Sequence, residues 1–312
     1  MPGDIPYPIP SFLSDHAQAV LAAPLPQGQN PPLDDTEGWL QMVAYANAGV
    51  AQRFGAVDLP VTIELREIAG VPVYVSRGPE VHDEDSTPLL VDLHGGAFII
   101  GGGELAGLMT APDALASGML TWAPDYRMPP LHPFPAAIDD ALAVYRAALE
   151  VRSPEDIAIA GTSAGGNLAA AVILRIKDEG LPMPGSVVLL SPEVDLTESG
   201  DTFQTLAKAS NTLGSLRDIN QLYAGGVELT HPYVSPLFGD VTGFPPTFVQ
   251  AGTRDLFLSN AVRFHRKLRA EGVDAELHVF EAMPHGGFAG APEDAEVSVE
   301  LRRFLDKHHP RV

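Results

Sequence analysis

One serine of the chain stands in a run of small residues, Gly161-Thr162-Ser163-Ala164-Gly165, between two apolar segments. The segment at 156–161 is typical of a buried strand and the following one of a helix, so Ser163 is predicted at a strand-turn-helix junction. Small neighbours let strand and helix approach closely around a strained serine. A serine held there could attack a carbonyl carbon while the N–H of Ala164 stabilises the resulting oxyanion. The same pattern also occurs by chance in glycine-rich loops.

A base is needed as well, because a serine hydroxyl alone is a weak nucleophile. His285 lies in a glycine-rich loop, Pro284-His285-Gly286-Gly287-Phe288, directly after the last predicted strand and before the final helix. It is our candidate for the base, with an ordinary turn histidine as the alternative. Other histidines are interpreted as structural, either within a strand, on a helix or in the tail: His265, His278, His308 and His309.

An acidic residue should orient that base. Asp255 follows the predicted strand at 246–252 and precedes His285, and it is our choice. Asp195, after the strand at 187–192, is the competitor, because some hydrolases place the acid one strand earlier. Glu193 and Asp195 are otherwise interpreted as ordinary loop and capping carboxylates.

Two further oxyanion donors are expected in the loop after the predicted strand at 89–94, where the sequence reads His94-Gly95-Gly96-Ala97-Phe98. Gly95 and Gly96 allow the backbone to turn so that two N–H groups point at one spot, beside that of Ala164. His94 is interpreted as tying the loop. Residues 101–106 match a dinucleotide-binding pattern but begin too far after their strand, and no phosphate-binding Gly-Lys-Ser/Thr follows a glycine-rich loop.

The elements that must position these residues alternate along the chain. Two helices and no strand are expected within the first 57 residues, where Asp34 and Glu37 have capping-box spacing, and a hairpin over 61–78 turns at Ala69-Gly70. Apolar strands and amphipathic helices then follow in turn, which predicts an α/β fold: an open, largely parallel sheet with helices on both faces. The expected strands lie at 89–94, 119–126, 156–161, 187–192, 246–252 and 276–283, and the expected helices at 135–150, 167–180, 259–272 and 292–309.

Residues 196–240 break this alternation with a helix-like segment too long for a crossover, as is typical of a lid or binding element.

Composition narrows the function classes. The chain has 312 residues, of which 45% are hydrophobic, enough for one or two domains with a large core. It contains no Cys, which excludes disulfides, thiolate metal sites and a cysteine nucleophile. A formal charge of -21 disfavours nucleic acid and anionic membrane surfaces as partners. No apolar run is long enough to span a membrane and the start, MPGDIPYPIP, does not resemble a signal peptide, so we expect a cytoplasmic protein.

Several long motifs, in the same order along the chain, resemble those of the hormone-sensitive-lipase-like branch of the α/β-hydrolases, which includes bacterial carboxylesterases. HGGAF (94–98) is similar to that family's HGGGF, DYRMPPLHPFPAAIDD (125–140) to its DYRLAPEHPFPAALDD, and GTSAGGN (161–167) to its GDSAGGN or GTSAGG variant. AGTRDLFL and PHGGF resemble its acid and histidine loops.

The resemblance implies an eight-stranded sheet with a helical cap, and hydrolysis of short to medium acyl esters without cofactor or metal. The cap would comprise residues 1–57 and 196–240, and the catalytic domain residues 58–195 and 241–312. A homodimer is implied by family habit alone. The roles implied for the site are nucleophile for Ser163, base for His285, acid for Asp255, and oxyanion donors for Gly95, Gly96 and Ala164.

Three departures from the family pattern bear on substrate details and not on the reaction class. Thr162 stands where the family usually has Asp, Ala97 replaces the third glycine, and Pro130-Leu131 replaces Pro-Glu. The same three side chains would also serve a lactone hydrolase, a xenobiotic-ester or amide hydrolase, or a peptidase. A non-catalytic small-molecule receptor on this fold is the remaining alternative, which the presence of His285 disfavours.

Overall fold

The computed structural model describes residues 7–23, 29–55, 58–207 and 213–310, and its centre is one eight-stranded sheet in the order β1-β2-β4-β3-β5-β6-β7-β8. The first two strands pair antiparallel, and β2 also pairs antiparallel with β4, whereas the remaining pairs are parallel. This confirms the predicted α/β fold with its mostly parallel sheet and its hairpin. The strands are β1 Thr62–Ile68, β2 Val71–Arg77, β3 Leu89–Leu93, β4 Leu120–Pro124, β5 Ile157–Thr162, β6 Ser186–Leu190, β7 Thr247–Arg254 and β8 Ala275–Pro284.

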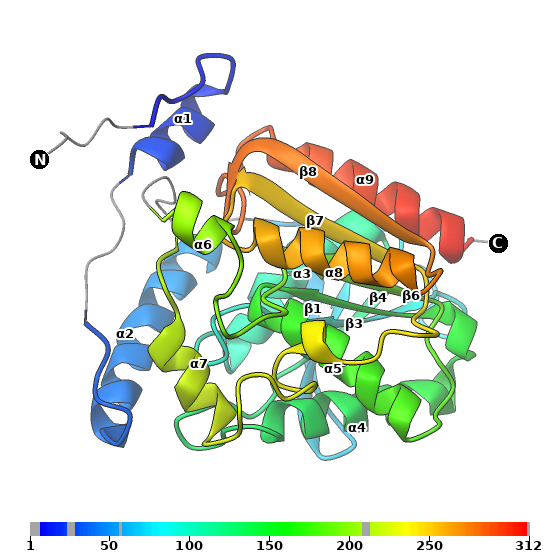
Figure 1. The fold of residues 1–312 in the computed structure, drawn as a ribbon. Coiled ribbons are helices and arrows are strands. Elements are labelled where there is room, and N and C mark those ends of the chain that lie inside the picture. The colour runs from blue at the N-terminus through cyan, green and yellow to red at the C-terminus, as the bar shows by residue number, and fades with distance from the viewer. Residues whose placement is uncertain (1–6, 24–28, 56–57, 208–212, 311–312) are drawn as a thin grey trace, which may run out of the picture.

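Helices cover both faces of the sheet (Figure 1). The central strands are apolar on both faces, as strands buried between two helical layers must be. Alternate residues pack on α4, α5 and α8 on one face, and on α3 and α9 on the other. The helices are α1 Asp15–Ala22, α2 Thr36–Gly55, α3 Glu104–Ser117, α4 Ala136–Val151, α5 Ala164–Asp178, α6 Thr202–Thr205, α7 Arg217–Ala224, α8 Leu258–Ala270 and α9 Asp294–His308, with 3-10 turns η1 Pro154–Asp156 and η2 Pro236–Phe238.

Helices α2, α6 and α7 come from distant parts of the chain and share one apolar cluster beside the sheet (Figure 1). Trp39 of α2, which is fully buried, packs there with Phe203 of α6 and Ile219 of α7. The cluster also contains Ile99 and Phe257, which lie in the loops after β3 and β7. It therefore joins the N-terminal helix and the inserted segment to two loops at the ends of sheet strands.

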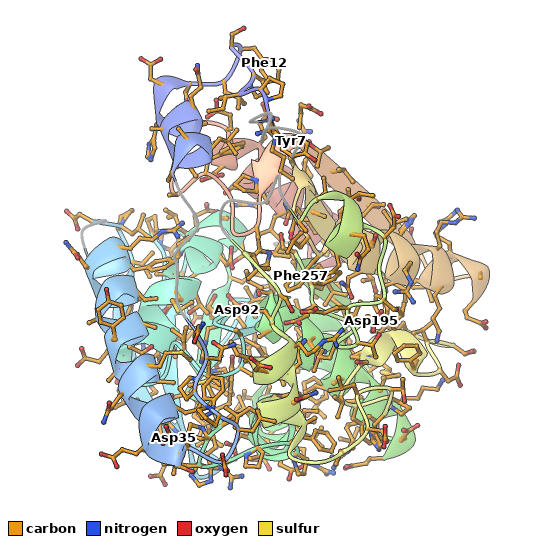
Figure 2. All side chains as sticks on the ribbon, turned by 60° about the vertical axis from the view of Figure 1, so that its left-hand side comes forward. Tyr7, Phe12, Asp35, Asp92, Asp195 and Phe257 are labelled. Carbon is orange, nitrogen blue, oxygen red and sulfur yellow. The ribbon has the colours of Figure 1, made fainter. Side chains whose placement is uncertain are left out.

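Helix α1 lies apart from that cluster, next to the end of β8 (Figure 1). Its apolar residues Ala17 and Leu21 pack with Met283 and Phe288. At its N-terminus, Ser14 donates both its backbone N–H and its hydroxyl to the carboxylate of Glu293. Figure 2 shows Tyr7 and Phe12 at this end of the molecule.

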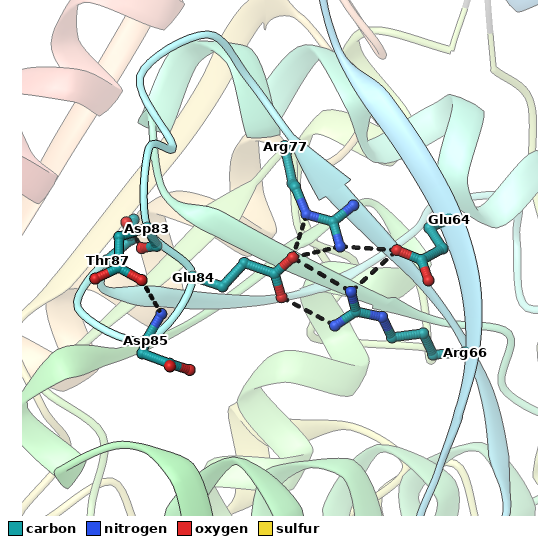
Figure 3. A network of polar contacts seen from close by, with 7 residues as sticks. All are labelled: Glu64, Arg66, Arg77, Asp83, Glu84, Asp85 and Thr87. Carbon is teal, nitrogen blue, oxygen red and sulfur yellow. Dashed lines mark hydrogen bonds and ion pairs between the residues drawn. The ribbon is translucent and has the colours of Figure 1, made fainter.

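The edge strand β1 is held by a network of ion pairs (Figure 3). Arg66 contacts Glu64 at 3.0 Å and Glu84 at 2.9 Å, and Arg77 contacts Glu64 at 2.8 Å. Exposed pairs contribute little individually, but here two arginines share two carboxylates and tie the loop after β2 to the hairpin. Charged side chains on an edge strand also disfavour pairing with another sheet.

Two sequence-based expectations about local structure need correction. The structure has a helix at 104–117 that we did not predict, because Pro112 inside it and the glycines before it are signals against a helix. The cap of α2 is Asp35 and not Asp34, since the Asp35 carboxylate accepts from the N–H of Gly38 at 2.9 Å. His309 is buried and lies 2.8 Å from the hydroxyl of Ser186, which agrees with its interpretation as a structural residue.

The inserted segment 196–240 is less helical than expected. Its described residues contain α6 of 4 residues, α7 of 8 residues and one 3-10 turn. Residues 208–212 of this segment, and residues 1–6, 24–28 and 56–57 of the predicted N-terminal cap segment, lie outside the described part of the chain.

Candidate active site

Ser163 lies at the junction of β5 and α5, as predicted, with φ 58° and ψ -117°. This left-handed conformation costs a non-glycine residue about 1–3 kcal/mol. Two glycines make the junction possible: a Cβ at Gly165 would lie 1.8 Å from the carbonyl oxygen of Leu93, and one at Gly161 would lie 2.1 Å from that of Gly165. The small residues around Ser163 are therefore required by the close approach of helix and strand.

Three polar side chains from separate loops form one hydrogen-bonded chain. The Oγ atom of Ser163 is 2.9 Å from Nε2 of His285, and Nδ1 of His285 is 3.1 Å from Oδ1 of Asp255. Ser163 and Asp255 are buried, with 7% and 0% exposure. With Nδ1 donating to the carboxylate, Nε2 is left as an acceptor for the serine hydroxyl. The structure thus brings together the three residues that the sequence singled out, in an order that can move a proton.

The loop carrying His285 is fixed on two sides. The carboxylate of Asp294, at the start of α9, accepts from the backbone N–H groups of Phe288 and Gly290, both at 2.8 Å. The ring of Phe257 meets the imidazole edge-on, with 4.7 Å between the centroids and an interplanar angle of 77°. Sequence reasoning did not identify Asp294 or Phe257, although Asp294 stands at the start of the predicted final helix, where a loop-capping carboxylate is common.

Asp255 also accepts a hydrogen bond from the backbone N–H of Phe257, at 2.8 Å and on the same oxygen, Oδ1, that faces His285. The competitor Asp195 is engaged elsewhere: it accepts from the hydroxyls of Thr197 and Ser199 at 2.5 and 2.6 Å, and pairs with Arg263 at 2.6 Å. Burial acts to raise the pKa of Asp195, but these hydrogen bonds lower it below its ordinary value. In the described part of the chain, Asp255 and not Asp195 faces His285.

The loop after β3 passes directly beside Ser163. A Cβ at Gly95 would lie 3.1 Å from the carbonyl oxygen of Thr162 and 3.5 Å from Cβ of Ser163. Gly96 has φ 118°, and a side chain there would meet the carbonyl oxygen of Ile100 at 2.2 Å. Ala97, which replaces the third family glycine, keeps a left-handed conformation with φ 51°. The loop thus follows a glycine-like path in spite of this substitution.

The contacts of His94, at the start of the same loop, hold the loop in place. Its ring stacks on Tyr126 at 4.2 Å, its Nδ1 is 2.7 Å from the carbonyl oxygen of Gly95, and the Tyr126 hydroxyl donates to the His94 carbonyl oxygen at 2.7 Å. Burial lowers the pKa of His94 to about 4, so its ring is neutral at neutral pH. This agrees with the interpretation of His94 as the tie of the loop.

A cavity of about 500 Å³ lies on the α3 and α9 side of the sheet. Its wall includes Thr162 and Gly286, the chain neighbours of Ser163 and His285, but neither of those two residues themselves. A second cavity of about 360 Å³ lies between α2 and the loop after β4. Both have the size of small-molecule sites.

Within the described ranges, no group of three or more His, Asp or Glu side chains is placed to hold a metal ion. No helix in the same ranges is long and apolar enough to cross a membrane.

The sheet order, the serine at its strand-turn-helix junction and the hydrogen-bonded chain together define an α/β hydrolase. Residues 90–289 match the model of the family described as alpha/beta hydrolase fold. An esterase of Acinetobacter venetianus is 36% identical over 70% of this chain and 72% of its own length. The crystal structure of an esterase, E25, superposes with a TM-score of 0.89, at 36% identity and 96% coverage of both chains. That of an esterase from the bacterial hormone-sensitive lipase family superposes with a TM-score of 0.79, at 30% identity, over 96% of this chain and 98% of that one.

The chain therefore belongs to the α/β-hydrolase fold family, within which it is a hormone-sensitive-lipase-like carboxylesterase. This confirms the resemblance to hormone-sensitive-lipase-like esterases, whereas the assignment to the GTSAGG variant stays a prediction.

Proposed function

We propose that the chain hydrolyses carboxylic esters through an acyl-enzyme intermediate formed on Ser163. The observation that carries this proposal is the 2.9 Å contact between Oγ of Ser163 and Nε2 of His285, with Asp255 on the far side of the ring. Nε2 takes the hydroxyl proton as Oγ attacks the ester carbonyl carbon, and Asp255 stabilises the imidazolium that forms. The imidazolium then protonates the leaving alcohol, and a water molecule, deprotonated by the same nitrogen, releases the acid.

The negative charge of the tetrahedral intermediate needs donors next to Ser163. We assign this role to the backbone N–H groups of Gly95, Gly96 and Ala164. The close passage of the Gly95 loop beside Ser163, and the position of Ala164 as the first residue of α5, support the assignment. Each donor of this kind is worth about 3 kcal/mol in the transition state.

We further propose a small-molecule ester with a short to medium acyl chain as substrate. The cavity of about 500 Å³ supports this size class. The segments 1–57 and 196–240 would form a cap over the catalytic domain, residues 58–195 and 241–312, and the apolar cluster shared by α2, α6 and α7 supports that division. A homodimer, a cytoplasmic location and the absence of nucleic-acid partners stay predictions from the sequence.

The test is a panel of p-nitrophenyl acetate, butyrate and octanoate, extended with lactones, assayed on the wild type and on Ser163→Ala. We expect saturable release of nitrophenol from the wild type and a loss of at least about 10⁴-fold in kcat/KM for the variant. Ser153→Ala, at an exposed serine before η1, serves as the control and should turn over normally. A folded Ser163→Ala protein that retained turnover would contradict the proposal, and hydrolysis of lactones in preference to esters would redirect the substrate class.

A further inference from the structure

A buried carboxyl group that the proposed mechanism does not use lies directly behind Ser163. Glu193, in the loop after β6, has 0% exposure. Its backbone N–H donates to the carbonyl oxygen of Ser163 at 3.2 Å, and its own carbonyl oxygen accepts from the side-chain amide of Asn167, in α5, at 2.8 Å. The backbone of Glu193 is therefore fixed to the junction that presents the serine.

The side chain of Glu193 reaches in the other direction, to helix α7 of the inserted segment. The amide Nδ2 of Asn220 donates to Oε1 of Glu193 at 2.8 Å and to the carbonyl oxygen of Leu196 at 3.2 Å. Ile219, the neighbour of Asn220, belongs to the apolar cluster that contains Phe257, whose ring contacts His285. A change in the position of α7 would therefore alter the wall beside the imidazole.

The surroundings of Glu193 are rich in hydrogen-bond acceptors and poor in donors. Four buried oxygen atoms have no hydrogen-bond partner within the described residues: Oε2 of Glu193, Oδ2 of Asp255, Oδ1 of Asn167 and Oδ1 of Asn220. A proton on Glu193 would supply a donor to this group and would avoid a second buried negative charge near Asp255.

The charges around Glu193 act in the same direction. Burial, followed by repulsion from Glu198, Asp195 and Asp255, raises the pKa of Glu193 to about 8, against the opposing effect of the hydrogen bond from Asn220. Arg263, a positively charged side chain of α8, is paired with Asp195 and not with Glu193 among the described contacts. Burial and these neighbouring charges thus favour the protonated form of Glu193 at neutral pH.

We propose that Glu193 is a positioning residue: as a neutral acid it holds α7 against the Ser163 junction, and its ionisation loosens α7 from the wall beside His285. The proposal rests on the proposed function above for its effect on turnover. It predicts that activity falls in alkaline solution for a reason that lies outside the three side chains of the hydrogen-bonded chain.

The test compares the pH profiles of wild type and Glu193→Gln, an isostere that stays neutral and can still accept from Asn220. A pH-stat follows acid release from methyl butyrate between pH 6 and 10. If only the protonated form is fully active, the wild type at pH 9 retains about a tenth of its neutral kcat/KM, whereas Glu193→Gln retains its plateau, a difference of about tenfold. Glu228→Gln, on the exposed surface of the same inserted segment, is the matched control and should follow the wild type.

The hydrogen bond between Glu193 and Asn220 is also tested from the Asn220 side, with Asn220→Ala. Removing the donor while Glu193 stays neutral should raise KM more than it lowers kcat at pH 7, because the wall of the site and not the proton path is disturbed. A Glu193→Gln variant that loses activity above pH 8 as the wild type does would overturn the proposal, as would an Asn220→Ala variant with unchanged KM.

An infrared measurement separates this proposal from the proposed function, since it does not depend on turnover. The difference spectrum of wild type minus Glu193→Gln should show the carbonyl stretch of a protonated carboxylic acid at pH 7 and lose it by pH 10. A spectrum without that band at pH 7 would overturn the role of Glu193 and leave the role of Ser163 untouched. Conversely, turnover by Ser163→Ala would remove the proposed function while the infrared band persisted.

Discussion

Replacing Asp255 by asparagine tests how the acid works, and the structure makes an unusual prediction for this substitution. One oxygen, Oδ1, accepts both the N–H of Phe257 at 2.8 Å and Nδ1 of His285 at 3.1 Å. A backbone N–H can only donate, so an asparagine must place its carbonyl oxygen, not its NH₂ group, at that position. The carbonyl oxygen would then still accept from Nδ1, and His285 would keep the tautomer that leaves Nε2 free for Ser163.

The expected loss of kcat/KM in Asp255→Asn therefore results from removal of the charge alone. Opposite charges about 4 Å apart attract by about 4 kcal/mol at an effective dielectric constant of 20. The neutral hydrogen bond that remains is worth about 1 kcal/mol, which leaves a loss of about 3 kcal/mol in the transition state, or about 10²-fold in kcat/KM. Asp255→Ala removes charge and orientation together and should cost about 10⁴-fold, the scale seen when the acid of such a triad is disabled.

The assay is steady-state hydrolysis of p-nitrophenyl butyrate by wild type, Asp255→Asn and Asp255→Ala, with circular dichroism to show that each protein is folded. Equal losses for the two variants would refute the reasoning, since the amide would then have turned its NH₂ group toward the imidazole. Normal activity in Asp255→Asn would refute the role of the charge.

Two further predictions concern a pair of aspartates and a loop glycine. Burial, and then repulsion from Asp113, raise the pKa of Asp92, and burial raises the pKa of Asp113 to about 7. Because both carboxyl groups bind protons more tightly in the folded state, their contribution to stability is complete below about pH 4 and is lost as the pH rises to 7. Asp92→Asn should therefore flatten this part of the pH profile of the unfolding free energy, and it should be more stable than the wild type at pH 8. An unchanged profile in urea titrations from pH 4 to 8 would show that the pair is not coupled to folding. Gly96→Ala would place a Cβ 2.2 Å from the carbonyl oxygen of Ile100 at φ 118°, so kcat should fall about 10²-fold or more as the oxyanion loop shifts. Gly103→Ala, at φ 67° with no atom within 4 Å, carries the backbone strain without the clash, and a comparable loss of kcat there would contradict the explanation.

The candidate site residues could be found in the sequence because small residues mark the positions where two backbone segments approach closely. Gly161 and Gly165 flank Ser163 where added Cβ atoms would overlap carbonyl oxygens, and Gly96 has a conformation that side chains rarely adopt. The fold could also be predicted, because strands buried on both faces are continuous apolar segments and the helices between them have apolar residues at a helical period. The position of each loop at the end of a strand then predicted which polar side chains could meet.

Contacts between side chains that are distant in sequence are not indicated by any local pattern of residues. The contact of Phe257 with His285 is set by the packing of elements and not by a local pattern. Helix α3 was missed for a related reason: Pro112 argues against a helix locally, and the burial of neighbouring Ala111 and Ala114 against the sheet overrides that preference.

Glu193 and Asp195 show most clearly where sequence reasoning ends. The two carboxyl groups are two residues apart, both have 0% exposure, and both were interpreted as ordinary loop carboxylates. Asp195 receives two hydroxyls and Arg263, and its pKa falls; Glu193 receives one amide, from Asn220, and its pKa rises to about 8. The number of donors that tertiary structure brings to each group decides which one keeps its proton. Thr197 and Ser199 stand close to Asp195 in the chain, but Asn220 comes from α7 and Arg263 from α8. The protonation state of Glu193 is therefore a property of the assembled fold, and a substitution in either helix can change it without touching the three side chains that meet at Ser163.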